Sequence, residues 1–157
     1  MGSTRIVAVA QGIAVTAHRD QVDKAGLPYI EHPRRVAELV AAAGGSDEAV
    51  AAAWLHDVLE DTDLTPEDLR VAGIPEEVVA AVRAVTHRCG ERLDDYAKRV
   101  AADPLAVQVK RADLADNTDP DRLGKLSAKD NDRLRAKYEL MRSLLDDAAP
   151  ADPAPAS

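Results

Sequence analysis

The amino-acid sequence predicts an all-α protein with one domain, and three observations support this. Alanine supplies 30 of the 157 residues, and alanine has the highest intrinsic preference for the helix. Aromatic residues make up only 3% of the chain, which has no Phe, whereas β-sheets favour aromatic and β-branched residues. Apolar residues recur at helical spacing, and no segment has the pattern of a strand. The length allows a single domain, which we place at residues 1–146.

The first half of the chain contains three predicted helices. Residues 4–16 are mostly apolar and predict the first helix. Residues 19–31 are polar and lack a helical period, which predicts a loop. A second helix is expected from Pro33, because proline is accepted in the first turn of a helix. Ser46 is a predicted N-cap, and it precedes one continuous helix over residues 49–61.

The second half also predicts helices, followed by a tail. Thr65 has the features of a helix start, and the short helix after it is expected to break at Gly73. Further helices are predicted over residues 75–87, 93–101, 104–117 and 130–145. Residues 147–157 hold three prolines and no large apolar side chain, which predicts a disordered tail rich in Pro and Ala.

The charge balance limits the partners. The chain has 20 basic and 28 acidic residues, a formal net charge of −8. This argues against binding to nucleic acid, which requires a concentrated positive surface, but it leaves room for a small phosphorylated ligand. No apolar run approaches the roughly 18 residues of a membrane span, so no membrane contact is expected. Cys89 is the only cysteine and cannot form an internal disulfide, which predicts a cytoplasmic location.

The strongest local feature lies in the predicted helix over residues 49–61. His56, Asp57, Glu60 and Asp61 would share one face of that helix, because residues three and four apart are neighbours. Three carboxylates this close repel one another, and a divalent metal is the simplest compensation. The alternative interpretation is a solvated polar stripe on an amphipathic helix.

Two further polar clusters are ambiguous when each is considered alone. His32 lies where the polar loop meets the second helix, and Asp113, Asp116 and Asn117 share a helix face further along. Each pattern also occurs in structural or solvent-facing positions. Together the clusters supply nitrogen and oxygen donors that suit a transition metal such as Mn, Fe, Co or Zn better than Ca, namely His32, His56, Asp57 and Asp113.

Three segments, taken together, resemble a known family. They are AHRDQVDKAGLPYIEHPRRVA, AAAWLHDVLEDT and VKRADLADNT, in this order along the chain. This combination resembles the HD-domain metal-dependent phosphohydrolases, and more closely the hydrolase domains of RelA/SpoT-type alarmone enzymes and the small alarmone hydrolases. The similarity extends over residues 6–145. It implies an all-helical HD-domain bundle around a single metal site.

The resemblance also implies roles for individual residues. The metal, usually Mn²⁺ in that family, would be held by His32, His56, Asp57 and Asp113. The acidic residues that follow the His-Asp pair serve catalysis in the family, which here means Glu60 and Asp61. Residues expected to contact substrate are Lys24, Asn117 and Tyr138.

Two positions depart from the family pattern. An Arg that packs on the substrate's base usually precedes the residue equivalent to Lys24, but Asp23 stands here. Asp20 replaces a usual Gly in the H-x-G-Q segment. An Arg plane can stack on a purine and neutralise phosphate, and Asp can do neither. The metal chemistry is therefore predicted to be retained, with base recognition altered.

We expect a Mn-dependent phosphohydrolase that removes the 3′-pyrophosphate of a (p)ppGpp- or (p)ppApp-like nucleotide. One alternative is an HD-domain phosphohydrolase that acts on another nucleotide or phosphorylated metabolite, which Asp23 would explain. An alternative of a different class is a nucleotide-binding HD module without turnover. The sequence leaves the oligomeric state open.

Overall fold

The architecture is helical throughout the residues that the computed structural model describes, 2–149. The bounds of the helices are α1 Gly2–Ala17, α2 Glu31–Ala42, α3 Asp47–Leu55, α4 Val58–Asp61, α5 Pro66–Val71, α6 Glu76–Val85, α7 Leu93–Ala101, α8 Pro104–Asn117, α9 Pro120–Leu123 and α10 Ala128–Ala148. Strand-like pairing within these residues is limited to one isolated antiparallel bridge, between Val22 and Pro28. The prediction of an all-α fold is confirmed.

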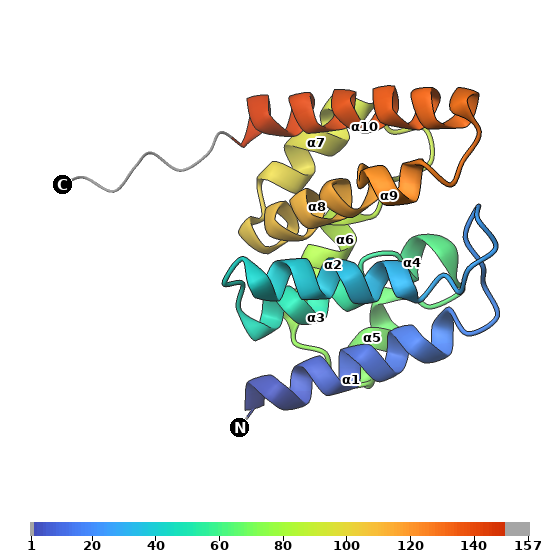
Figure 1. Ribbon diagram of the computed structural model, residues 1–157. Helices are drawn as coiled ribbons and strands as arrows, with labels where there is room; N and C mark the ends of the chain where they lie inside the picture. The colour runs from blue at the N-terminus through green and yellow to red at the C-terminus, as the bar shows by residue number, and fades with distance from the viewer. Residues whose placement is uncertain (1, 150–157) are drawn as a thin grey trace.

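Helix α3 forms the centre of the fold. It packs against α1, α2, α6 and α8, while α10 lies against α7 at the opposite end from α1 (Figure 1). Four alanines of α3 are at most 1% exposed: Ala49, Ala51, Ala52 and Ala53. Because alanine adds only a methyl group, neighbouring helices can approach α3 closely, which explains how the core is built with few aromatic residues.

The predicted helix starts depend on local hydrogen bonds that the structure contains. The Ser46 hydroxyl accepts the backbone N–H of Ala49 at 3.2 Å and caps α3. Thr65 and Asp68 form a reciprocal capping box at the start of α5. Such caps satisfy N–H groups that have no partner within the helix.

The predicted continuous helix over residues 49–61 is wrong. The helix ends at Leu55, and α4 begins at Val58 after a turn formed by His56 and Asp57. His56 Nδ1 lies 2.7 Å from the carbonyl oxygen of Ala53 and so competes for an acceptor that the next helical turn would use. The break releases Asp57 from helical register, so the four polar residues do not share one helix face.

The other observed helix boundaries differ less from the predicted ones. Helix α2 starts at Glu31, two residues before Pro33, and α9 was not predicted. Helix α10 ends at Ala148, so the first two residues of the predicted tail are helical. The remainder of that tail, residues 150–157, lies outside the described residues.

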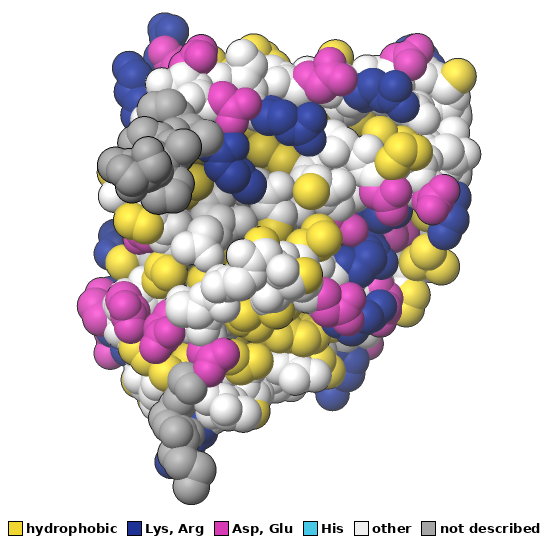
Figure 2. All heavy atoms as spheres, turned by 60° about the vertical axis from the view of Figure 1, so that its left-hand side comes forward, with side chains coloured by type: hydrophobic (Ala, Val, Ile, Leu, Met, Phe, Trp, Pro, Cys, Tyr) yellow, Lys and Arg dark blue, Asp and Glu magenta, His cyan; other side chains and the backbone are white. Residues whose placement is uncertain are grey.

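The distribution of surface charge and the character of the helices are relevant to binding of nucleic acid and membranes. On the face drawn in Figure 2, Lys and Arg side chains are scattered among acidic and apolar ones rather than gathered in one patch. In the described part of the chain, no helix has both the length and the apolar character required to cross a bilayer.

Candidate metal centre and active site

A cavity of about 940 Å³ opens beside the break between α3 and α4. Small-molecule sites in proteins typically have volumes of about 300–1,000 Å³. Its walls come from the α1–α2 loop, the α3–α4 turn, the α6–α7 loop and the helices α8 and α10. All nine residues that the sequence predicted for the site line it: Lys24, His32, His56, Asp57, Glu60, Asp61, Asp113, Asn117 and Tyr138.

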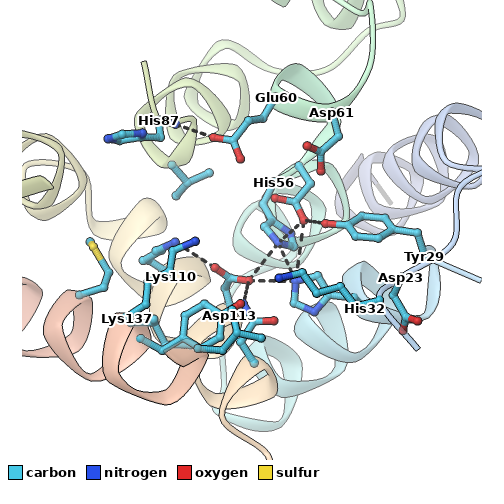
Figure 3. A pocket seen from close by; sticks show the side chains of 18 of the residues that line it. Asp23, Tyr29, His32, His56, Glu60, Asp61, His87, Lys110, Asp113 and Lys137 are labelled. Carbon is cyan, nitrogen blue, oxygen red and sulfur yellow. Dashed lines mark hydrogen bonds and ion pairs between the residues drawn. The ribbon is translucent and has the colours of Figure 1, made fainter. Parts of the chain in front are cut away.

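Four potential ligand atoms converge at the floor of this cavity (Figure 3). His32 Nε2 lies 3.3 Å from His56 Nε2 and 2.9 Å from Asp113 Oδ1. His56 Nε2 is 3.4 Å from the same Asp113 oxygen. Asp57 Oδ2 completes the group, at 3.1 Å from His56 Nε2 and 3.8 Å from His32 Nε2. Residues from α2, the α3–α4 turn and α8 thus meet at one point.

These separations suit a first-row metal ion. Metal–ligand bonds of about 2.0–2.2 Å place neighbouring ligand atoms roughly 3.0–3.5 Å apart. The five separations given above, from 2.9 to 3.8 Å, cover that range, and the ligand atoms of His32, His56 and Asp113 all lie within 4.8 Å of one another. Two imidazole nitrogens with two carboxylate oxygens are a donor set that transition metals favour over Ca²⁺. The residues present therefore fit a metal ion.

The two histidines are oriented so that Nε2 faces this point. Nδ1 of His56 donates to the carbonyl of Ala53, and Nδ1 of His32 donates to Asp116 Oδ2 at 2.6 Å. Asp116 also accepts from Arg35 Nε at 2.8 Å and from a guanidinium nitrogen of Arg122. Partners of this kind fix the tautomer and ring orientation of metal-ligating histidines.

The two carboxylates are held as firmly. The Tyr29 hydroxyl donates to Asp57 Oδ2. Lys110 Nζ lies 3.0 Å from Asp113 Oδ2, and the Asn117 amide donates to Asp113 Oδ1 at 3.0 Å. The partly buried ammonium of Lys110 thus engages the Asp113 oxygen that faces away from the two histidines.

The ionisation of these groups reflects their close contacts. Burial opposes the charged form of Asp113, but Lys110 and the histidines outweigh it and hold the Asp113 pKa well below its usual range. Burial likewise opposes ionisation of Asp57, yet neighbouring His56 lowers its pKa to about 2. Burial alone would lower the pKa of His32, but hydrogen bonds with carboxylates raise it overall. The histidines and the carboxylates thus favour one another's charged forms.

Glu60 and Asp61 lie above this cluster on α4 (Figure 3). Glu60 Oε1 accepts the backbone N–H of His87 at 2.9 Å, which turns its carboxylate toward the α6–α7 loop. Desolvation raises the pKa of Glu60, and the charges of Asp57 and Asp61 add to that effect. Desolvation and Asp57 raise the pKa of Asp61 too. Both carboxylates are therefore better proton acceptors than ordinary surface acids.

Comparison with known proteins identifies the family. A family model described as an HD domain matches residues 10–145, most of the chain. The chain belongs to the HD-domain family. The match includes the adjacent residues His56 and Asp57 at the α3–α4 break.

Several relatives of this HD domain carry a functional name. A guanosine-3′,5′-bis(diphosphate) 3′-pyrophosphohydrolase of Aquifex aeolicus is 38% identical over 117 residues, which covers 69% of this chain and 16% of that protein. A protein of the same name from Haemophilus influenzae is 36% identical over 113 residues, 68% of this chain and 17% of that one. The chain therefore spans less than a fifth of the length of these relatives.

A relative covered over a larger share of its length and a solved structure are also similar to this chain. The guanosine-3′,5′-bis(diphosphate) 3′-pyrophosphohydrolase MESH1 of Danio rerio is 41% identical over 71 residues, 43% of this chain and 39% of that protein. A solved structure, titled as a metazoan ortholog of SpoT that hydrolyzes ppGpp, aligns with a TM-score of 0.74 at 25% identity. That alignment covers 95% of this chain and 88% of the other, so the HD-domain fold is shared over nearly the whole chain.

Asp23 has a structural role in this HD domain. Its Oδ1 accepts the backbone N–H groups of Ala25 and Leu27, each at 2.9 Å. It thereby closes the turn in which Gly26 adopts a φ of +80°. Lys24 follows on this turn, exposed at the cavity edge.

Other residues of the HD-domain site were missed or left unassigned by sequence reasoning. The sequence pattern places Asp116 on a helix face and does not indicate its contact with His32, 84 residues earlier. Lys110 stands in the quoted VKRADLADNT segment, at the spacing of one helical turn before Asp113, and that spacing was the available signal. The hydrogen bond from His87 to Glu60 had no signal in the sequence.

Proposed function

We propose that this HD domain is a Mn²⁺-dependent phosphohydrolase that removes the 3′-pyrophosphate of a (p)ppGpp- or (p)ppApp-like nucleotide. The observation that carries the proposal is the meeting of four metal-ligand atoms beneath two partly desolvated carboxylates in one cavity. The names of the relatives support the choice of substrate class.

The proposed ligands of the metal are His32, His56, Asp57 and Asp113. When bound, the metal would lower the pKa of a coordinated water and polarise the phosphate. Manganese is proposed over other divalent ions because the mixed nitrogen and oxygen set suits it and because the resemblance implies it.

Glu60 and Asp61 are the proposed catalytic residues. Glu60 would accept the proton of the attacking water, since its pKa is raised by desolvation and its free oxygen Oε2 is the one that His87 does not hold. Asp61 would orient the water or Glu60. As the water oxygen bonds to phosphorus, the bond between that phosphorus and the ribose 3′-oxygen breaks, and a proton passes to the 3′-oxygen as pyrophosphate leaves.

The substrate is proposed to lie along the cavity between the turn that carries Lys24 and helix α10. Lys24 would contact phosphate, and Tyr138 would contact the nucleoside from the α10 side. Asn117 donates to Asp113 and is proposed to contact substrate through its amide oxygen. Because the Asp23 carboxylate is committed to its own turn, base recognition is assigned to the α10 side of the cavity.

An HD-domain phosphohydrolase for another phosphorylated metabolite remains the second candidate, and Asp23 favours it. A screen of phosphate and pyrophosphate release over nucleotides and sugar phosphates separates the two. Release from a 3′-pyrophosphorylated guanosine or adenosine nucleotide supports the first candidate, and release only from other compounds supports the second. Purified protein without stoichiometric metal and without turnover would indicate a binding module.

The proposal includes a domain over residues 1–146, a cytoplasmic location, and no nucleic-acid or membrane partner. The net charge of −8 supports the absence of a nucleic-acid partner, and the single cysteine supports the cytoplasmic location.

A further inference from the structure

The position of Glu60 depends on a segment far from it in the sequence. Its Oε1 accepts the N–H of His87, which belongs to the α6–α7 loop, residues 86–92. Within the described residues its other oxygen, Oε2, has no hydrogen-bond partner and faces the cavity. The conformation of the α6–α7 loop therefore decides where the free oxygen of Glu60 points.

Arg99 of α7 anchors this loop on both sides of His87. Its guanidinium donates to three carbonyl oxygens that precede His87, at 2.8 Å to Arg83, 3.1 Å to Ala84 and 2.7 Å to Thr86. It also pairs with both carboxylate oxygens of Glu91, which follows His87, at 2.9 and 2.8 Å. Carbonyls at a helix C-terminus have no partner within the helix, so Arg99 satisfies groups that α6 leaves open.

Tyr96 reinforces the same segment from one turn earlier on α7. Its hydroxyl donates to the carbonyl of Val85 at 2.5 Å, and its ring meets the His87 ring edge-on with centroids 4.9 Å apart. The Arg99 guanidinium lies 5.5 Å from the centre of the Tyr96 ring. Two side chains of α7 thus hold the backbone that leads to His87 and the His87 ring itself.

Arg99 is not expected to contact the phosphates of the substrate, whereas the Tyr96 side chain lines the cavity. Arg99 is not among the residues that line the cavity, and its guanidinium nitrogens are used by the contacts to α6 and the loop. A direct electrostatic effect on bound nucleotide is therefore not its function. Its influence on chemistry must pass through the loop.

We propose that Arg99 is a positioning residue for Glu60, which it places through the α6–α7 loop and the backbone N–H of His87, with Tyr96 as a second support. This rests on the role of Glu60 as proton acceptor in the proposed function. Lysine cannot reproduce the fork of a guanidinium, so Arg99→Lys keeps the charge and loses the simultaneous contacts. A displacement of about 1 Å in a catalytic group can cost about 100-fold in rate.

The first test is a double-mutant cycle on pyrophosphate release by the Mn²⁺-loaded protein. Arg99→Lys is expected to lower kcat by about 10- to 100-fold, with KM and Mn²⁺ affinity within twofold of wild type. In the Glu60→Gln background the same substitution is expected to cause no further loss. Equal losses in both backgrounds, or full activity of Arg99→Lys, would overturn the proposal, because a general structural role does not depend on Glu60.

Two further single variants are measured beside the cycle. Tyr96→Phe removes only the hydroxyl that holds Val85, and we expect a smaller loss of kcat in the same direction. Arg92→Lys is the matched control, because Arg92 is exposed at the start of the same helix and, among the described residues, forms an ion pair with Asp94 alone. An equal loss in Arg92→Lys would also count against the proposal.

The second test needs no substrate. Hydrogen exchange of the His87 amide is measured by NMR in the full chain, with diamagnetic Mg²⁺ added in place of Mn²⁺. The amide is expected to be protected in wild type, and to exchange at least about tenfold faster in both Glu60→Ala and Arg99→Lys. Unchanged exchange in Arg99→Lys refutes the proposal, even if the wild-type protein releases no pyrophosphate, which would refute the proposed function alone.

Discussion

Replacement of Asp116 by Asn is expected to weaken Mn²⁺ binding although Asp116 is not one of the four proposed ligands. Its Oδ2 accepts Nδ1–H of His32 at 2.6 Å and so presents Nε2 of His32 to the ligand cluster. Its Oδ1 accepts from Arg35 at 2.8 Å. Asn keeps the size of the side chain and one acceptor oxygen, but it removes the charge that both contacts use.

The size of the expected loss of Mn²⁺ affinity follows from the hydrogen bond to His32 and from the charge of Asp116. A hydrogen bond to a charged group contributes about 1.5–3 kcal/mol, and loss of a carboxylate behind a ligating histidine costs about 10- to 100-fold in metal affinity. Asp116→Asn also leaves the positive charges of Arg35 and Arg122 uncompensated near the site. We therefore expect the dissociation constant for Mn²⁺ to rise by about 10- to 100-fold, which is about 1.4–2.7 kcal/mol.

Isothermal titration of metal-free protein with Mn²⁺ measures this change. Glu38→Gln is the control, because Glu38 lies exposed on the same helix as His32 and its one ion pair within residues 2–149 is with Arg34. The control should bind Mn²⁺ as wild type does. A dissociation constant for Asp116→Asn within twofold of wild type would show that Asp116 does not support the ligand histidine.

Three further predictions concern the same cavity and its support. Lys110→Met should weaken Mn²⁺ binding by about tenfold, because it frees the outer oxygen of Asp113; unchanged affinity in the same titration contradicts this. Asp61→Asn should move the acid limb of the kcat profile to lower pH, because the Asp61 charge raises the Glu60 pKa and the deprotonated base is the active form; a limb that stays in place or rises refutes it. Leu55→Ala should lower stability by about 3 kcal/mol and Tm by roughly 6–12 °C, since Leu55 is 0% exposed beside His56; a calorimetric shift under 2 °C would be too small for a core site.

The fold could be predicted from the sequence because its signals are local. Ser46 and Thr65 mark helix starts through hydrogen bonds to residues three positions away, and the structure contains both. The break at His56 could not be predicted, since apolar periodicity continues through it. A side-chain contact with the carbonyl of Ala53 ends that helix, and the pattern of residue types carries no information about this choice.

The candidate site could be predicted in its residues more than in its contacts. The donor types of His32 and Asp113 suggested a metal, and the structure places these two residues 2.9 Å apart across 81 positions of sequence. The partners that orient them depend on tertiary packing. Asp116 contacts His32 because α2 packs on α8. His87 contacts Glu60 because the α6–α7 loop lies beside α4.

In the proposed reaction, a metal held by this cluster supports cleavage of a 3′-pyrophosphate with Glu60 as proton acceptor. The most direct measurement is pyrophosphate release from ppGpp and ppApp by wild type, Asp57→Ala and Glu60→Ala, with bound Mn²⁺ quantified in each protein. We expect release by wild type, loss of both metal and release in Asp57→Ala, and retained metal without release in Glu60→Ala. No release from either nucleotide by Mn²⁺-loaded wild type, or full activity of Glu60→Ala, would contradict it.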